Sequence, residues 1–224
     1  MSSVISGSRR VRIGRRSIVR EARGASAVEF ALVSTLLLSL VFGIVEFTLA
    51  LFQWNSAETA TQMGARLAVQ SDAVASEIRT YSGVSDDGLE PGTLLTTATV
   101  PAFTIRCTNI ACTCVSGACK GLESTYDAAA FNAIVSEVQI VFPTAQAANV
   151  LVEYSHIGLG FAGRPGADLV PSVTVELTGL TFNFLFLDVV LDVRTGGAGG
   201  VGGGIPMPPF TATLTAEDLN SAGA

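Results

Sequence analysis

The 224-residue chain is poor in the side chains that most enzymes use for catalysis. It contains one histidine, His156, and only 14% of its residues are charged, whereas 49% are hydrophobic. No G-x-S-x-G motif accompanies the histidine, and no spacing of carboxylates indicates a catalytic pair. A lone histidine at the end of a predicted strand is typically structural or solvated. We therefore expect no catalytic residue and a protein that is not an enzyme.

Nucleotide-binding motifs are also missing. Residues 158–163 read GLGFAG, but Arg-Pro-Gly follows at 164–166 and cannot open the helix that a dinucleotide site needs. Residues 195–204 read TGGAGGVGGG, with no Lys-Ser or Lys-Thr behind them. We expect this second stretch to be a flexible loop. The sequence thus predicts no cofactor.

Basic residues are scarce outside the N-terminal segment. Residues 1–24 contain seven arginines and one acid, which leaves six basic and eighteen acidic residues in the remaining 200, a net charge of −12. Contacts to phosphates need a positive face, so the body of the protein is not expected to bind nucleic acid. A cluster of arginines directly before an apolar run is typical of a topology signal instead.

A long apolar run follows these arginines. Residues 30–45 are sixteen consecutive uncharged residues, and the apolar pattern resumes after Glu46. A bilayer core of about 30 Å takes roughly 20 helical residues, so residues 25–54 suffice for one transmembrane helix. The arginines place its N-terminus in the cytoplasm, and everything after about Trp54 on the other side of the membrane.

Two alternatives compete with a functional span. One is a cleaved secretory signal peptide, with Thr48-Leu49-Ala50 as the cleavage site. The other is a plain anchor in which Glu29 and Glu46 are incidental. A charge within a span costs about 3 kcal/mol on insertion scales, which favours a functional or interfacial role for both carboxylates.

Residues 23–30, RGASAVEF, resemble the processing site of class III signal peptides, and residues 24–70 closely resemble the N-terminal segment of TadE-like proteins. That family comprises pseudopilin or minor-pilin components of tight-adherence (Flp-type) pili. The resemblance implies cleavage by a prepilin peptidase between Gly24 and Ala25, which makes Glu29 the fifth residue of the mature chain. It also implies assembly with other pilin subunits and an inner-membrane platform.

The chemistry of this segment agrees with such a role. Cleavage after Gly24 would create an α-ammonium group at Ala25, and Glu29 lies about one helical turn beyond it. A buried ion pair in apolar surroundings costs far less than either charge alone. Glu29 can therefore pair with the ammonium group of a neighbouring subunit and fix the axial register of assembly. The alternative is a tolerated acid that suits the first turn of a helix.

The helix is expected to continue past the membrane, because small and apolar residues recur at spacings of three and four as far as Tyr81. Residues 127–141 predict a second helix capped by Asp127 and stopped by Pro143. Alternating patterns predict strands at residues 150–154, 173–178, 182–186 and 210–215, with one or two edge-like strands within 92–106. Gly179 is a predicted bulge or turn, and the tail after Leu219 is expected to fray. The fold class is α+β: a long transmembrane helix packed on a small, mostly antiparallel, pilin-like sheet.

Four cysteines cluster within thirteen residues, in the spacing C-x4-C-x-C-x4-C, at positions Cys107, Cys112, Cys114 and Cys119. An even number in a segment facing an oxidising compartment favours two disulfides. Pairing Cys112 with Cys114 would be strained, which leaves the sequential and the crossed pairings open. A zinc site would need two-residue spacers, which are absent, so no metal is expected.

Together these features predict a cytoplasmic leader (1–24), a transmembrane helix (25–54) and an extracytoplasmic α+β domain (55–224). The leading hypothesis is a pseudopilin of a tight-adherence pilus in the bacterial inner membrane. An alternative is an unprocessed, single-pass anchor for a periplasmic binding domain. A secreted enzyme with a site around His156 is a third.

Overall fold

The computed structural model describes residues 16–184, 186, 204–216 and 219, and for residues 16–23 the backbone alone. The chain forms two compact units, Met1–Phe47 and Thr48–Ala224. Much of the predicted leader, the glycine-rich loop as far as residue 203 and the tail after Leu219 lie outside the described residues.

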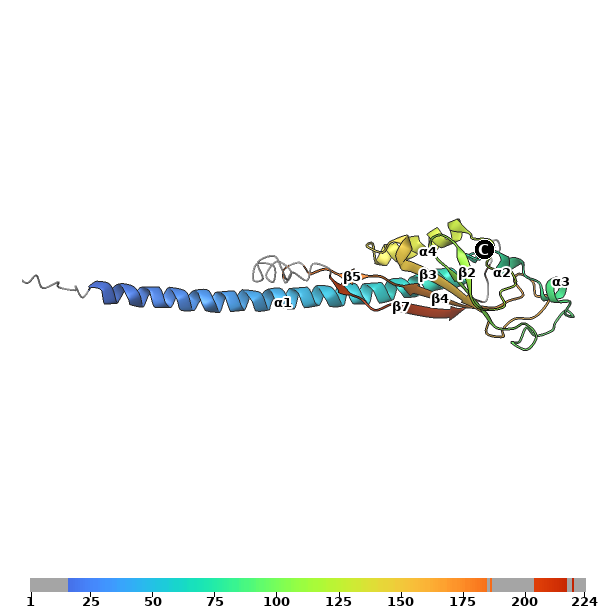
Figure 1. Ribbon diagram of the computed structural model, residues 1–224, viewed down its shortest axis with the longest axis horizontal. Coiled ribbons are helices and arrows are strands. Elements are labelled where there is room, and N and C mark those ends of the chain that lie inside the picture. The colour runs from blue at the N-terminus through green and yellow to red at the C-terminus, as the bar shows by residue number, and fades with distance from the viewer. Residues whose placement is uncertain (1–15, 185, 187–203, 217–218, 220–224) are drawn as a thin grey trace, which may run out of the picture. The chain divides into compact units, whose positions relative to one another are not determined.

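The dominant element is the helix α1 (Arg16–Gln70) (Figure 1). No proline interrupts this stretch, and Ala, Leu and Glu favour a helix throughout it. The expectation that the helix runs to about Tyr81 is wrong, because α1 ends at Gln70. Two short helices follow it, α2 (Glu77–Thr80) and α3 (Gly83–Asp87).

Long-range backbone contacts end α1. The N–H of Val74 donates to the hydroxyl of Tyr154 at 2.9 Å, and its C=O accepts from the N–H of Asp127 at 2.8 Å. Ala75 forms an isolated β-bridge with Tyr126. These bonds use the donor and acceptor that a continuing helix would need, so the chain leaves the helical path here.

Five antiparallel strands form the main sheet, in the order β2-β1-β3-β4-β7. Their bounds are β1 (Phe103–Cys107), β2 (Cys112–Gly117), β3 (Val150–Ser155), β4 (Ser172–Leu177) and β7 (Phe210–Thr215). A second sheet pairs β5 (Thr181–Phe182) with β6 (Ile205–Pro206). The 3₁₀ helix η1 (Ala147–Asn149) leads into β3.

The sheet has one buried and one polar face, as its alternating sequence predicts. Ile105, Tyr154 and Val173 lie side by side on the buried face, and each is completely buried. On the other face Arg106 forms a 2.9 Å ion pair with Glu153 of the neighbouring strand. In this register the apolar side chains of neighbouring strands share one face of the sheet, which the helices cover.

The helices α4 (Ala128–Val141) and α1 share that buried core. The carboxylate of Asp127 caps α4 by accepting from the N–H groups of Ala129 and Ala130, as predicted. A Cβ atom at Gly64 of α1 would stand 2.8 Å from Val138 of α4 and 3.5 Å from Val175 of β4. Gly64 therefore lets α1 approach α4 and the sheet closely.

The predicted α+β fold class is confirmed, with some differences among the strands. The pattern at residues 182–186 yields only β5, and the stretch 92–106 yields only β1 as a strand. Strand β2 was not predicted. Gly179 has a φ of 69° and turns the chain between β4 and β5, which agrees with the expected turn.

Candidate functional site

The apolar part of α1 is the first candidate for a functional surface. By length and composition Gly24–Gln70 is a candidate membrane span, with a mean hydropathy of 2.3 in its most apolar stretch, none of which is buried in the protein. Large exposed side chains include Phe30, Leu36, Ile44 and Phe47. An apolar surface that wide is typical of a helix solvated by lipid or by other helices.

Three hydroxyl groups in this stretch, those of Ser34, Thr35 and Ser39, bond to backbone C=O groups of the preceding turn. Ser34 donates to the C=O of Phe30 at 2.7 Å, and Thr35 donates to the C=O of Ala31 at 2.7 Å. Bonding to the preceding turn spares a hydroxyl from lying unpaired in a medium without water. The polar residues of the stretch are thus compatible with a bilayer.

The proposed processing residues Gly24 and Ala25, and the acid Glu29, all lie on α1 and are exposed. Ala25 and Glu29 are four residues apart, so they lie about 6 Å apart along the helix axis and on one face. Glu46, by contrast, is 2% exposed although its neighbours face outward. Only Glu29 of the two carboxylates is therefore available to a partner.

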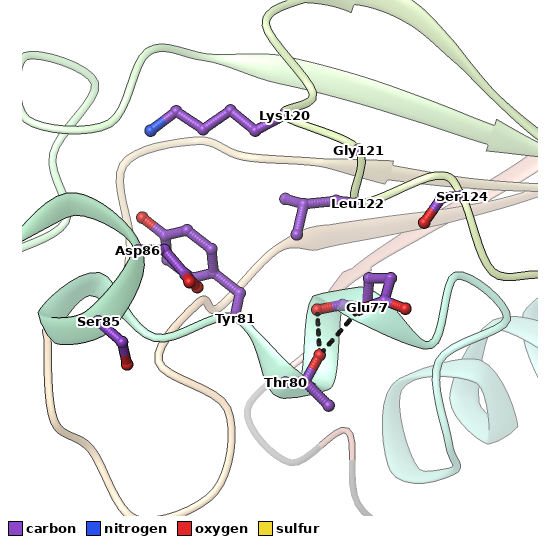
Figure 2. Close-up of a pocket in the computed structure, with 9 residues that line it drawn as sticks. All are labelled: Glu77, Thr80, Tyr81, Ser85, Asp86, Lys120, Gly121, Leu122 and Ser124. Atoms are coloured by element: carbon purple, nitrogen blue, oxygen red, sulfur yellow. Dashed lines mark hydrogen bonds between the residues drawn. The ribbon is translucent and has the colours of Figure 1, made fainter.

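A polar hollow of about 630 Å³ lies around α2, α3 and the segment after β2 (Figure 2). Glu77 dominates one wall, where it accepts from Thr125 at 2.7 Å and from Thr80 at 3.2 Å. The lining is formed by Glu77, Thr80, Tyr81, Ser85, Asp86, Lys120, Gly121, Leu122 and Ser124. Sequence reasoning did not find this hollow, because its walls come from segments about forty residues apart.

Asp87 joins two of the side chains that line this hollow, Tyr81 and Lys120. Its carboxylate accepts hydrogen bonds from the hydroxyl of Tyr81 and from the ammonium group of Lys120. Although burial raises the pKa of Asp87, the bonds from Lys120 and Tyr81 outweigh it and hold that pKa below its ordinary value. Burial and the nearby Asp87 raise the pKa of Tyr81, which stays protonated. Lys120 is thus already paired with a carboxylate within the chain.

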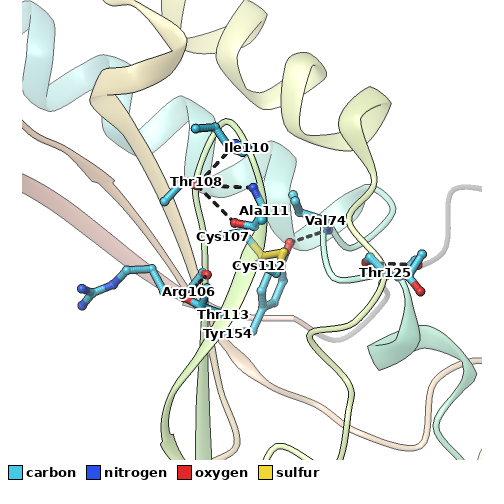
Figure 3. The surroundings of a disulfide bond; sticks show 11 residues. Val74, Arg106, Cys107, Thr108, Ile110, Ala111, Cys112, Thr113, Thr125 and Tyr154 are labelled. Atoms are coloured by element: carbon cyan, nitrogen blue, oxygen red, sulfur yellow. Dashed lines mark hydrogen bonds between the residues drawn. A yellow bond between two sulfur atoms is a disulfide. The ribbon is translucent and has the colours of Figure 1, made fainter.

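The four cysteines form two disulfides, Cys107–Cys112 and Cys114–Cys119, and none is free. This is the sequential pairing, one of the two that spacing left open. Cys107 and Cys112 face each other across the β1–β2 hairpin, near the buried ring of Tyr154 (Figure 3). Each sulfur is bonded to its disulfide partner, so none of the four can bind zinc as a thiolate.

His156 is not placed for catalysis. The side chain is 2% exposed, and its ring stacks on Phe103 with centroids 5.6 Å apart. Burial lowers its pKa, and backbone groups of Leu95 and Val100 oppose that shift. The ring is therefore neutral at pH 7 and closed to a substrate, which agrees with a structural histidine.

A buried carboxylate that sequence reasoning missed, Asp168, ties its own loop to the start of α3. It accepts from the N–H groups of Gly83 at 2.8 Å, Gly163 at 3.0 Å and Arg164 at 3.0 Å. An acid within a glycine-rich stretch is a local signal for such a loop. The partner at Gly83, 85 residues away, has no sequence signal.

The part of α1 that contains Gly24, Ala25 and Glu29 is similar to a known protein family. A family model described as TadE-like protein matches residues 24–66. The chain carries a TadE-like segment. The match confirms the resemblance predicted from the sequence and indicates a pilus-associated component of a tight-adherence system. No curated protein and no solved structure matches the chain.

The TadE-like segment begins at Gly24 and ends within the second unit of the chain. It includes Ala25 and Glu29, the whole apolar surface and the first buried turns of α1 at Ala57 and Ala60. The sheet, α4, both disulfides and the polar hollow all lie beyond it. The family match therefore describes the helix, and the fold beyond residue 66 stands on the structure alone.

Proposed function

We propose that the chain is a membrane-anchored pseudopilin of a tight-adherence, Flp-type IV pilus. The observation that carries this is the coincidence of the TadE-like match with an exposed apolar helix that presents Glu29 near its start. In this proposal the protein acts as a structural component rather than as an enzyme. Its partners are other pilin or pseudopilin subunits, the assembly platform and a prepilin peptidase.

The proposed topology follows the charges of the chain. Residues 1–24, with their arginines, form the cytoplasmic leader; residues 25–54 cross the inner membrane; and residues 55–224 form the domain on the periplasmic or extracellular side. The two disulfides support this orientation, since disulfides persist in an oxidising compartment. Labelling of intact cells at residues beyond 55 tests it directly.

Glu29 is proposed to set the register of assembly. After cleavage between Gly24 and Ala25, its carboxylate would bind the new α-ammonium group of a neighbouring subunit within the apolar layer. Glu29 is exposed, so its carboxylate can be reached by a neighbouring subunit, which supports this role. Two subunits related by this pair would be held at one axial offset.

N-terminal sequencing of protein purified from membranes is the decisive experiment. A start at Ala25 supports the pilin route, whereas a start at Met1 indicates an unprocessed anchor and a start near Leu51 a secreted protein. A companion variant, Glu29→Gln, should insert and fold normally but lose co-purification with other pilus subunits. The matched control is Glu58→Gln, an exposed acid further along α1. Normal co-assembly of Glu29→Gln would refute the register role.

The polar hollow favours a second candidate, an unprocessed anchor for a periplasmic binding domain. Its carboxylates and hydroxyl groups form a concave surface of the kind that small polar ligands occupy. The sequencing experiment separates this candidate from the first, because only a pseudopilin of this type requires the start at Ala25.

A further inference from the structure

Strand β7 forms one open edge of the main sheet. Within the part of the chain that the structure describes, β7 pairs with β4 alone, over Phe210–Thr215. The backbone N–H of Ala216 donates to the C=O of Pro171 at 2.9 Å, which extends this ladder by one residue. Bonded and non-bonded pairs alternate in an antiparallel ladder, so every second residue counted back from Ala216 bonds to β4. The residues between them direct their N–H and C=O groups to the open edge, and these are Thr211, Thr213 and Thr215.

The side chains agree with this assignment. The hydroxyl groups of Thr213 and of Thr174, its partner on β4, lie 2.8 Å apart. Side chains of opposed residues come closest in the non-bonded pairs of an antiparallel ladder. No hydrogen bond from another described residue reaches the outward backbone groups of the three threonines. The edge of β7 therefore presents a row of backbone donors and acceptors that the described fold leaves unused.

This edge lacks the features that normally prevent a sheet from adding another strand. Natural edges are protected by charges, prolines, bulges or a covering element. The sequence of β7, FTATLT, contains no charge and no proline, and its register with β4 is continuous. The opposite edge, β2, differs, because its register with β1 shifts between Thr104 and Ile105 and each disulfide includes one of its cysteines. β7 is therefore the edge that can accept a further strand.

A groove of about 280 Å³ follows the open edge of β7. Its lining comes from α1 and β7, and consists of Gln62, Arg66, Thr211, Ala212, Thr213 and Leu214. Trp54 of α1 contacts Phe210 at the start of β7, with ring centroids 5.0 Å apart, so this part of α1 runs alongside the strand (Figure 1). Leu214 pairs with the buried Val173 and shares its face of the sheet, yet it is 39% exposed. The groove thus has room for the side chains of an added strand, and Leu214 offers them an apolar contact.

Arg66 indicates which side chain such a strand would carry. Arg66 is exposed and forms no ion pair with the described residues. The 200 residues after Gly24 contain only six basic groups, so a free guanidinium beside an open sheet edge is unusual in this chain. A carboxylate on the inner face of an added strand would pair with it. Strands β2, β5, β6 and β7 contain no Asp or Glu, so none of these strands in a second copy would supply that carboxylate.

We propose that β7 binds an extended segment of another protein, which adds to the main sheet as a further strand. The segment bonds to the outward backbone groups of β7 and places a carboxylate beside Arg66. The rest of its inner face is apolar and covers Leu214. This recognition is independent of cleavage at Gly24, of Glu29 and of membrane anchoring, and it goes beyond the proposed pilus role.

A synthetic peptide tests this pairing on the full chain in detergent micelles. The probe is Thr-Val-Thr-Glu-Thr-Val-Thr, blocked at both ends and carrying a fluorophore, and anisotropy measures its Kd. Alternation places its threonines on the outer face of the sheet and its valines and glutamate on the inner face. One control peptide is N-methylated at the two inner threonines, and a second has glutamine in place of glutamate. The matched protein variants are Arg66→Gln, in the groove, and Asn132→Asp, an exposed site on α4 that changes the net charge equally.

We expect the glutamate peptide to bind with a Kd below about 1 mM. N-methylation should weaken binding by about tenfold or more, because it removes two donors and blocks the approach of the strand. Arg66→Gln should weaken binding of the glutamate peptide about two- to fivefold and leave the glutamine peptide unaffected. Asn132→Asp should change neither affinity.

Three results would overturn the proposal. The first is no binding at about 1 mM, or binding that N-methylation leaves unchanged. The second is equal affinity of the glutamate peptide for Arg66→Gln and the unaltered chain. The third is a dimer of the chain alone, measured by sedimentation, that Thr213→Pro dissociates, because a second copy would then occupy the edge. Thr213→Pro keeps the bonds to β4, since the N–H of Thr213 faces outward. N-terminal sequencing of the same protein tests the pilus role separately.

Discussion

The hydroxyl group of Tyr154, near the end of the central strand β3, accepts a 2.9 Å hydrogen bond from the backbone N–H of Val74, just past the end of α1. Both residues are completely buried. This bond joins the point where the chain leaves the long helix to the centre of the sheet. The position of α2 and α3, and with them the polar hollow, depends on this junction.

Tyr154→Phe should destabilise the second unit by about 1–3 kcal/mol, because it leaves the buried N–H of Val74 without an acceptor. Urea unfolding of the full chain in detergent, followed by circular dichroism, measures the loss. Tyr126→Phe is the control, since that partly buried ring packs on Phe131, and a change within about 0.5 kcal/mol is expected there. Equal effects of the two variants would contradict the role given to the Tyr154 hydroxyl.

Asp168→Ala should cost about 3 kcal/mol, because the buried carboxylate accepts hydrogen bonds from the backbone N–H groups of Gly83, Gly163 and Arg164, and alanine can accept none of them. Hydrogen exchange should then speed up at Gly83, Gly163 and Arg164 together. Glu176→Gln, on the polar face of the sheet, serves as the control. Faster exchange at Gly163 and Arg164 alone would show that the tie to Gly83 contributes nothing.

Gly64→Ala should destabilise the protein by about 1–3 kcal/mol, although alanine favours a helix by about 1 kcal/mol over glycine. The new methyl group would meet a side-chain methyl group of Val138 at 2.8 Å, so either Val138 or the two helices must shift. Gly43→Ala is the matched control on the same helix, with nothing within 4 Å of the added atom. The double variant Gly64→Ala/Val138→Ala should recover part of the loss. A stabilising Gly64→Ala would refute the close packing.

Stability should fall as the pH drops from about 7 to 5, through the single histidine. Burial lowers the pKa of His156 below its ordinary value of 6.5, so the unfolded chain takes up the proton first and gains stability as the pH falls. His156→Phe, which keeps a ring to stack on Phe103, should flatten this dependence. Unfolding midpoints of both proteins at several pH values provide the test, and parallel curves would contradict it.

The elements that could be predicted from the sequence are those whose pattern is local. Helix α4 has a capping aspartate, one apolar face and a proline just beyond its end, and strand β7 alternates over its full length. The candidate segment around Glu29 was also accessible, because the acid stands out in an apolar run. Each of these signals lies within about fifteen residues.

The elements that escaped prediction depend on distant partners. The sequence pattern of small residues that marks α1 continues beyond its end, toward Tyr81. The helix ends early because Tyr154, Tyr126 and Asp127 bind the backbone at Val74 and Ala75. Strand β2 has only its first residue, Cys112, buried, so it lacks the alternation that marks a strand. The segment forms a strand because its backbone pairs with β1, and its own sequence pattern does not reveal that partner.

The sulfur bridges of the β1–β2 hairpin each span a separation of only five positions. Closing so short a loop removes little freedom from the unfolded chain, on the order of 2 kcal/mol per bridge in the chain-entropy view. Neither bridge links the hairpin to α1, α4 or the remaining strands. The chain can therefore fold around its apolar core before either disulfide forms, and a reducing agent would loosen the β1–β2 hairpin without unfolding the rest.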